Sequence, residues 1–177
     1  MVCGEENLDE KIDSDEKGFF CMSCAVDDRP SCSAIGSGTT LVTLDSASDA
    51  HCAPPWFGAG CVHYPDSGPV LRDAQKRPIP FESIAEVPMM TTAGGSSELL
   101  KVKMRLGPTI SKPLFSLCRM MDAGAKCWLS SEGSYMEHGT SRVPVGRQND
   151  SLAIEVRAFA SENEARVEKR SLTVVPV

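Results

Sequence analysis

The sequence has few aromatic residues and no long apolar run. Only 6% of its 177 residues are Phe, Trp or Tyr, whereas glycine (14) and proline (12) are spread along the chain. This mixture predicts short strands separated by turns rather than a helical bundle. No apolar run approaches the roughly 18–20 residues that a membrane-spanning helix needs, so we expect no membrane partner.

Two further absences bear on compartment and partners. The first 17 residues are acidic and polar, so they lack the apolar core of a secretory signal. We therefore expect an intracellular, cytoplasmic protein whose eight cysteines stay reduced. An excess of positive charge is also missing, since the net charge is −6. This argues against nucleic acid as the main partner, because a phosphate backbone calls for a basic face.

Composition divides the chain into three parts. Residues 1–36 are acidic and polar, which predicts a disordered tail. Residues 37–160 are long enough for one domain with a core of its own. Residues 161–177 form a C-terminal tail that begins with a polar stretch capable of forming a helix.

Two segments of the central part are predicted strands. Residues 39–44 are β-branched and apolar, so they read as a buried strand, and they run directly into Asp45 and Ser46, which favour turns. Residues 100–106 alternate apolar and cationic side chains, which predicts a strand with one buried and one solvated face. Prolines among residues 77–88 place that segment at a sheet edge or in a projecting hairpin.

The periodicity changes in residues 113–124. Apolar side chains there follow helical spacing, Ser116 can cap the first turn, and Gly124 stands where a helix ends. This predicts one short helix. The strands predicted after it cover residues 126–130, 142–145 and 152–159.

A buried strand that runs into an aspartate and a serine occurs in aspartic proteases. These enzymes need two carboxylates about 3 Å apart that share one proton, because like charges that close cannot both ionise. Each aspartate sits on a rigid loop, and the hydroxyl residue after it links the two loops. Asp45 and Ser46 fit this requirement. Taken alone, the same two residues also fit an Asx turn that ends a strand.

Residues 39–159 resemble the retropepsin family, and specifically the protease segment of Copia-like retrotransposon polyproteins. The resemblance rests on four blocks in order: 44–52 (LDSASDAHC), 71–80 (LRDAQKRPIP), 100–102 (LKV) and 112–124 (KPLFSLCRMMDAG). It implies an all-β fold, a closed β-barrel or sandwich with a flap hairpin and one short helix. It also implies an aspartic endopeptidase without metal or organic cofactor, whose substrate is its own polyprotein. Because the chain has one such motif, a homodimer would complete the site.

The resemblance assigns roles to residues of the loop. Asp45 corresponds to the catalytic aspartate, Ser46 to the residue that bonds across to the partner loop, and Asp49 to a residue that binds the substrate main chain. Arg119 would pair with Asp49 and brace the loop. Ala47 stands where the family usually has glycine. Its methyl group is tolerated if φ is negative, and otherwise strains the loop by about 1 kcal/mol.

The resemblance also implies a flap within residues 77–97. Its tip region is placed at residues 84–86, so Ile84 and Ala85 join the predicted substrate-binding residues.

Other readings remain open. The domain could be a catalytically inactive dimerisation or peptide-binding module that keeps the fold. Cys21, Cys24 and Cys32 could join His51 in a zinc site, although no second CxxC follows. His51 and Cys52 could suggest a nucleophile and base, but adjacent residues on an extended chain point to opposite faces.

Overall fold

The computed structural model describes residues 19–21, 38–91 and 98–173. Most elements there are strands, which confirms the predicted all-β class. They are β1 (Phe19–Cys21), β2 (Thr40–Asp45), β3 (Cys52–Ala53), β4 (His63–Tyr64), β5 (Leu71–Asp73), β6 (Ser83–Thr91), β7 (Leu99–Leu106), β8 (Leu114–Ser116), β9 (Lys126–Trp128), β10 (Ser134–His138), β11 (Ser141–Gln148) and β12 (Ser151–Ala158). The helices are the 3-10 turn η1 (Pro55–Gly58), α1 (Leu117–Asp122) and α2 (Glu162–Thr173).

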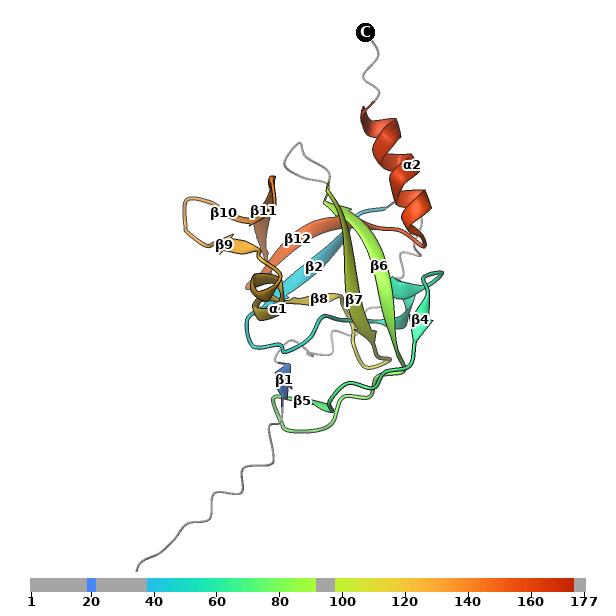
Figure 1. The fold of residues 1–177 in the computed structure, drawn as a ribbon. Helices are drawn as coiled ribbons and strands as arrows, with labels where there is room; N and C mark the ends of the chain where they lie inside the picture. The colour runs from blue at the N-terminus through green and yellow to red at the C-terminus, as the bar shows by residue number, and fades with distance from the viewer. Residues whose placement is uncertain (1–18, 22–37, 92–97, 174–177) are drawn as a thin grey trace, which may run out of the picture.

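Ten strands form one sheet, in the order β4-β6-β7-β3-β8-β2-β12-β11-β10-β9. Strand β12 pairs with β2 and also with β6. The pairings β6–β7–β3–β8–β2–β12–β6 therefore form a closed ring of strands, from which β11, β10 and β9 extend (Figure 1). Strands β1 and β5 form a separate parallel pair.

The strand predicted at residues 100–106 is confirmed as β7. Val102, Met104 and Leu106 are buried in the main core, whereas Lys101 and Lys103 are exposed. The alternation of the sequence thus matches the two faces of the strand.

The strand predicted at residues 39–44 is confirmed as β2, which lies inside the sheet. It pairs in parallel with β8 on one side and antiparallel with β12 on the other. Val42 and Leu44 are buried in the core. The β-branched and apolar composition of β2 follows from burial on this inner position.

The short helix predicted at residues 113–124 is confirmed as α1. The Ser116 side chain accepts a hydrogen bond from the backbone N–H of Arg119, and Gly124 beyond the helix has φ 92°. Glycine adopts this left-handed conformation without the penalty of a Cβ.

A second helix, α2, occupies the polar stretch of the C-terminal tail, which the sequence showed to be capable of forming a helix. Ala165 is fully buried in a cluster with Met90 and Phe159, and Arg157 is paired with Glu168. Helix α2 therefore packs against the sheet, because one small apolar residue lets it approach closely.

The predicted position of the flap tip was wrong. Residues 84–86 lie within β6, where Ile84, Ala85 and Glu86 face β7 residues across a regular ladder. The segment is not a sheet edge either, because β6 also pairs with β4 and then with β12. A proline is tolerated at position 88 of β6 because it lies between the residues that pair with β4 and those that pair with β12.

A tight turn lies instead at residues 73–77. The N–H of Lys76 donates to the Asp73 carbonyl over 2.8 Å, and the N–H of Asp73 donates to the Arg77 carbonyl over 2.9 Å. Lys76 has φ 64°, the left-handed region expected in such a turn. The connection between β6 and β7, residues 92–97, lies outside the described residues.

Candidate active site

Asp45 stands where two neighbouring strands, β2 and β8, both end. It is the last residue of β2 and faces Ser116, the last residue of β8, in the parallel pair. The turn after β2 and the first turn of α1 therefore begin side by side. A parallel pair brings the carboxyl ends of both strands to one edge, which is where polar side chains from distant segments can meet.

The two carboxylate oxygens of Asp45 have different surroundings. Oδ1 accepts a hydrogen bond from the backbone N–H of Ala47 over 2.8 Å, which makes an Asx turn. Oδ2 is buried and has no hydrogen-bond partner among the described residues, while the residue as a whole is 7% exposed. A buried acceptor without a partner costs free energy, about 1–3 kcal/mol. The Asx turn and the unpartnered oxygen occur together, so the turn does not account for the whole carboxylate.

The loop after Asp45 is braced by β8 and the first turn of α1. Three side chains there donate to three carbonyl oxygens of the loop, which fixes its backbone independently of the loop's own side chains. The pairs are Ser116 Oγ to Ser48, Cys118 Sγ to Ser46 (3.5 Å) and Arg119 Nε to Asp49 (3.0 Å). Arg119 thus braces the loop as predicted, through the main chain of Asp49.

Ser116 and Cys118 were not predicted as site residues. The sequence marked Ser116 as a helix cap, and that role is confirmed. Its second bond, to Ser48, joins residues 68 positions apart and has no local signal. The bond from Cys118 to Ser46 likewise joins residues far apart in the sequence, 72 positions, and has no local signal.

Ala47 introduces no backbone strain. The non-glycine residues with positive φ in the described part of the chain are Lys76, Asn149 and Asp150, so φ of Ala47 is negative. The methyl group in place of glycine is therefore compatible with this loop. Ser46 is exposed and Ala47 is half-buried.

The predicted substrate-binding residues do not form one group. Asp49 and Ile84 line the same open groove of about 770 Å³. Ala85 is fully buried in the main core, so it cannot touch a substrate, and that assignment was wrong. The error follows from its place in β6, where its side chain points inward.

His51 lies against the braced loop and also lines the groove. Its Nδ1 accepts a hydrogen bond from the N–H of Ser116 over 3.2 Å, and its ring meets that of Phe115 edge-on at 5.3 Å. Burial and the nearby Arg119 lower the pKa of His51 to about 4. At neutral pH the ring is therefore uncharged, with the proton on Nε2. Cys52 is buried and its Sγ donates to the carbonyl of Ala50 over 3.6 Å.

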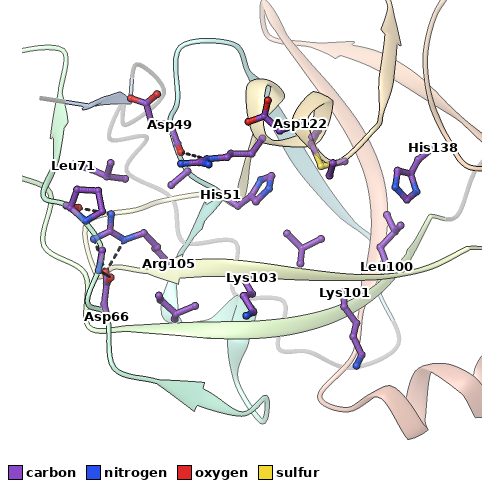
Figure 2. A pocket seen from close by; sticks show the side chains of 18 of the residues that line it. Asp49, His51, Asp66, Leu71, Leu100, Lys101, Lys103, Arg105, Asp122 and His138 are labelled. Atoms are coloured by element: carbon purple, nitrogen blue, oxygen red, sulfur yellow. Dashed lines mark hydrogen bonds and ion pairs between the residues drawn. The ribbon is translucent and has the colours of Figure 1, made fainter. Parts of the chain in front are cut away.

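The groove runs along β7 (Figure 2). Asp49, His51 and Asp122 lie on one side of it and Lys101 and Lys103 along the other. His138 stands at one end, and the ion pair of Arg105 with Asp66 (2.7 Å) stands at the other. Asp45, Ser46 and Ala47 do not line this groove.

Part of the zinc prediction falls outside the described residues. This holds for Cys24 and Cys32 and for the side chain of Cys21. Among the described residues, no group of three His, Cys, Asp or Glu side chains is placed to hold a metal ion. No helix in the described ranges has the length and apolar character needed to cross a bilayer.

Comparison with known proteins identifies no relative. The chain matches no protein-family profile, no curated protein and no solved structure.

Proposed function

We propose that the chain is one subunit of a homodimeric aspartic endopeptidase of the retropepsin type, from a Copia-like retrotransposon polyprotein. The observation that carries the proposal is the carboxylate of Asp45, which ends a buried inner strand with one oxygen bonded and the other without a partner. In a dimer, the second Asp45 would supply that missing partner through a shared proton.

The braced loop supports this reading. A catalytic dyad needs both carboxylates to stay within a few tenths of an ångström of their productive positions. The three hydrogen bonds to loop carbonyls provide such rigidity. Exposed Ser46, next to Asp45, is available to bond to the second subunit. The closed ring of strands agrees with the barrel of a retropepsin-like fold.

The proposed reaction follows from the dyad. One Asp45 would act as base on a water molecule while the other, protonated, donates to the scissile carbonyl. The bond cleaved is a peptide bond, and the proposed substrate is the polyprotein itself, in the cytoplasm. The residues require no metal or organic cofactor for this step.

One observation favours a second candidate, an inactive dimerisation or peptide-binding module of the same fold. Asp45 Oδ2 is buried within the single subunit, so a dyad requires the loop to shift when the subunits associate. If the loop does not shift, Asp45 is a structural residue and the fold binds without cutting.

Cleavage by the Asp45→Asn variant separates the two candidates. Wild-type protein is expected to cleave peptides that span its own polyprotein at mildly acidic pH, measured by mass spectrometry of the products. Asn keeps an oxygen for the Ala47 N–H but cannot share the proton, so activity should fall by at least 10³-fold, as for other triad and dyad residues. The matched control is Asp150→Asn in an exposed turn, which should keep full activity. Cleavage that survives Asp45→Asn contradicts the protease assignment, and a folded wild-type protein without cleavage supports the inactive module.

A further inference from the structure

Strand β7 has one paired edge and one edge that is largely unpaired. On the β6 side, the Leu106 carbonyl accepts a hydrogen bond from the backbone N–H of Glu82. On the other side, the backbone N–H of Arg105 donates to the backbone carbonyl of His51 over 2.9 Å. Because backbone groups of successive residues alternate between the edges, Lys103 and Lys101 share the outward direction of Arg105. Beyond the short pairing of β3 with Arg105 and Leu106, no described strand lies on that edge.

The 770 Å³ groove follows this unpaired edge. Its walls include Leu99, Leu100, Lys101, Val102, Lys103 and Arg105. Consecutive side chains of a strand point to opposite faces, so a groove that all of them line must run along the edge between the faces. The N–H and C=O groups of Lys101 and Lys103 therefore point into it.

The groove also contains side-chain atoms without partners. Glu98 Oε2 and His138 Nδ1 are buried and make no hydrogen bond in the described part of the chain. His138 Nδ1 lies 3.7 Å from Glu98 Oε1, beyond hydrogen-bond distance. On the opposite wall, the Nε2–H of neutral His51 is a further donor. Buried polar groups are normally satisfied, so their presence here points to a polar ligand.

Charge narrows the choice of ligand. The side chains of Lys101 and Lys103 point to the same face of β7. Lys101 is paired with Glu162, whereas Lys103 forms no ion pair within the described residues. A second copy of β7 would bring its own lysines against them, which is unfavourable for cross-strand neighbours. Carboxylates at alternate positions of an added strand would be favourable, and apolar residues between them would face Leu100 and Val102.

We propose that this edge of β7 is a docking site for an extended polypeptide segment in which acidic and apolar residues alternate. The segment adds to β7 as a further strand, so the backbone groups of Lys101 and Lys103 supply the main-chain bonds. The site is separate from Asp45, and it does not depend on the proposed protease activity.

Hydrogen exchange tests the added strand directly. The probe is the acetylated and amidated peptide Glu-Val-Glu-Leu-Glu-Val-Gly, added to the full-length Asp45→Asn protein so that cleavage cannot interfere. In the free protein the amides of Lys101 and Lys103 should exchange quickly, and those of Val102 and Met104, which face β6, slowly. Saturating peptide should slow the first pair at least tenfold by NMR. No change in their exchange, or slow exchange already in the free protein, overturns the proposal.

A proline variant tests which group binds. Lys103→Pro removes an outward N–H that β6 does not use, so the ladder to β6 stays intact. Lys103→Val removes the charge and keeps the N–H. By fluorescence anisotropy, we expect the Kd to rise about threefold for Lys103→Val and a further fivefold or more for Lys103→Pro. Equal affinity of the two variants overturns backbone pairing, and equal affinity of wild type for a probe with Lys in place of Glu overturns the charge preference.

Discussion

At the scale of single residues, Asp45 and His51 are held by the same short segment. Ser116 faces Asp45 across the β2–β8 pair, and its N–H donates to His51. Motif and composition were enough to predict Asp45 and Ser46 as neighbours at the end of a strand. They were not enough to predict the bonds from Ser116, because a hydrogen bond across 65 residues depends on where two strands meet.

The low pKa of His51 leads to a pH-dependent stability. The unfolded chain takes up a proton near pH 6.5, whereas the folded protein does so only near pH 4. Between these values the unfolded state binds more protons, so stability rises with pH and is lost as pH falls. We expect His51 alone to lower the free energy of unfolding, measured with urea, by about 1–2 kcal/mol at pH 5 relative to pH 7.

His51→Gln provides the comparison. Gln keeps an oxygen for the Ser116 N–H and cannot titrate, so the difference between pH 7 and pH 5 should shrink by that amount. An NMR titration that places the His51 pKa near 6.5 in the folded protein would contradict the prediction.

At the scale of elements, the β11–β12 hairpin has a turn residue that does not favour its own backbone conformation. The β11–β12 hairpin turns through Asn149 and Asp150, with φ of 44° and 61°. Positive φ at both central residues is the geometry of a type I′ turn, for which Asn-Gly is the favoured pair. The sequence therefore has a turn residue at position 150 that is not the best available.

Asp150→Gly should stabilise the protein by about 0.5–1 kcal/mol, because glycine adopts φ 61° without strain. The ion pair of Asp150 with Arg147 is lost, but both side chains are largely exposed at the tip, so the pair contributes little. Urea unfolding measures the change. Ser151→Gly, at the start of β12, is the control and should destabilise by a similar amount. A lower stability of Asp150→Gly would show that the ion pair matters more than the turn geometry.

The neighbours of β6 could not be predicted from its sequence. Three prolines among residues 77–88 indicated an edge or a projecting hairpin, and the family resemblance placed the flap tip at residues 84–86. The strand is in fact paired on both sides, with β7 on one side and with β4 and β12 on the other, and Pro88, its one proline, lies between the last two pairings. Local proline content cannot reveal which neighbours a strand will have.

At the scale of the whole molecule, the proposed function requires two copies of the ring of strands. A mixture of wild-type and Asp45→Asn subunits should therefore lose activity faster than simple dilution predicts. Random pairing with a threefold excess of the variant leaves about a quarter of the wild-type activity, because only matched wild-type pairs hold both acids. Cleavage rate at fixed wild-type concentration measures this. Activity that does not change with added variant would contradict a shared site, and Asp150→Asn serves as the neutral partner.

The sequence by itself determined the class of the fold and the places where several elements begin and end. The alternation in β7, the cap and terminal glycine of α1, and the apolar run of β2 are local properties, and local periodicity reports on burial of each face. The aspartate at the end of β2 was visible for the same reason.

Only the tertiary structure decided what those elements contact. It placed Ser116 beside Asp45, buried Ala85, packed α2 onto the sheet, and left the outward backbone of β7 without a partner strand. Each of these depends on the register between segments far apart in the chain. Register is set by the packing of the whole core, which no short stretch of sequence contains.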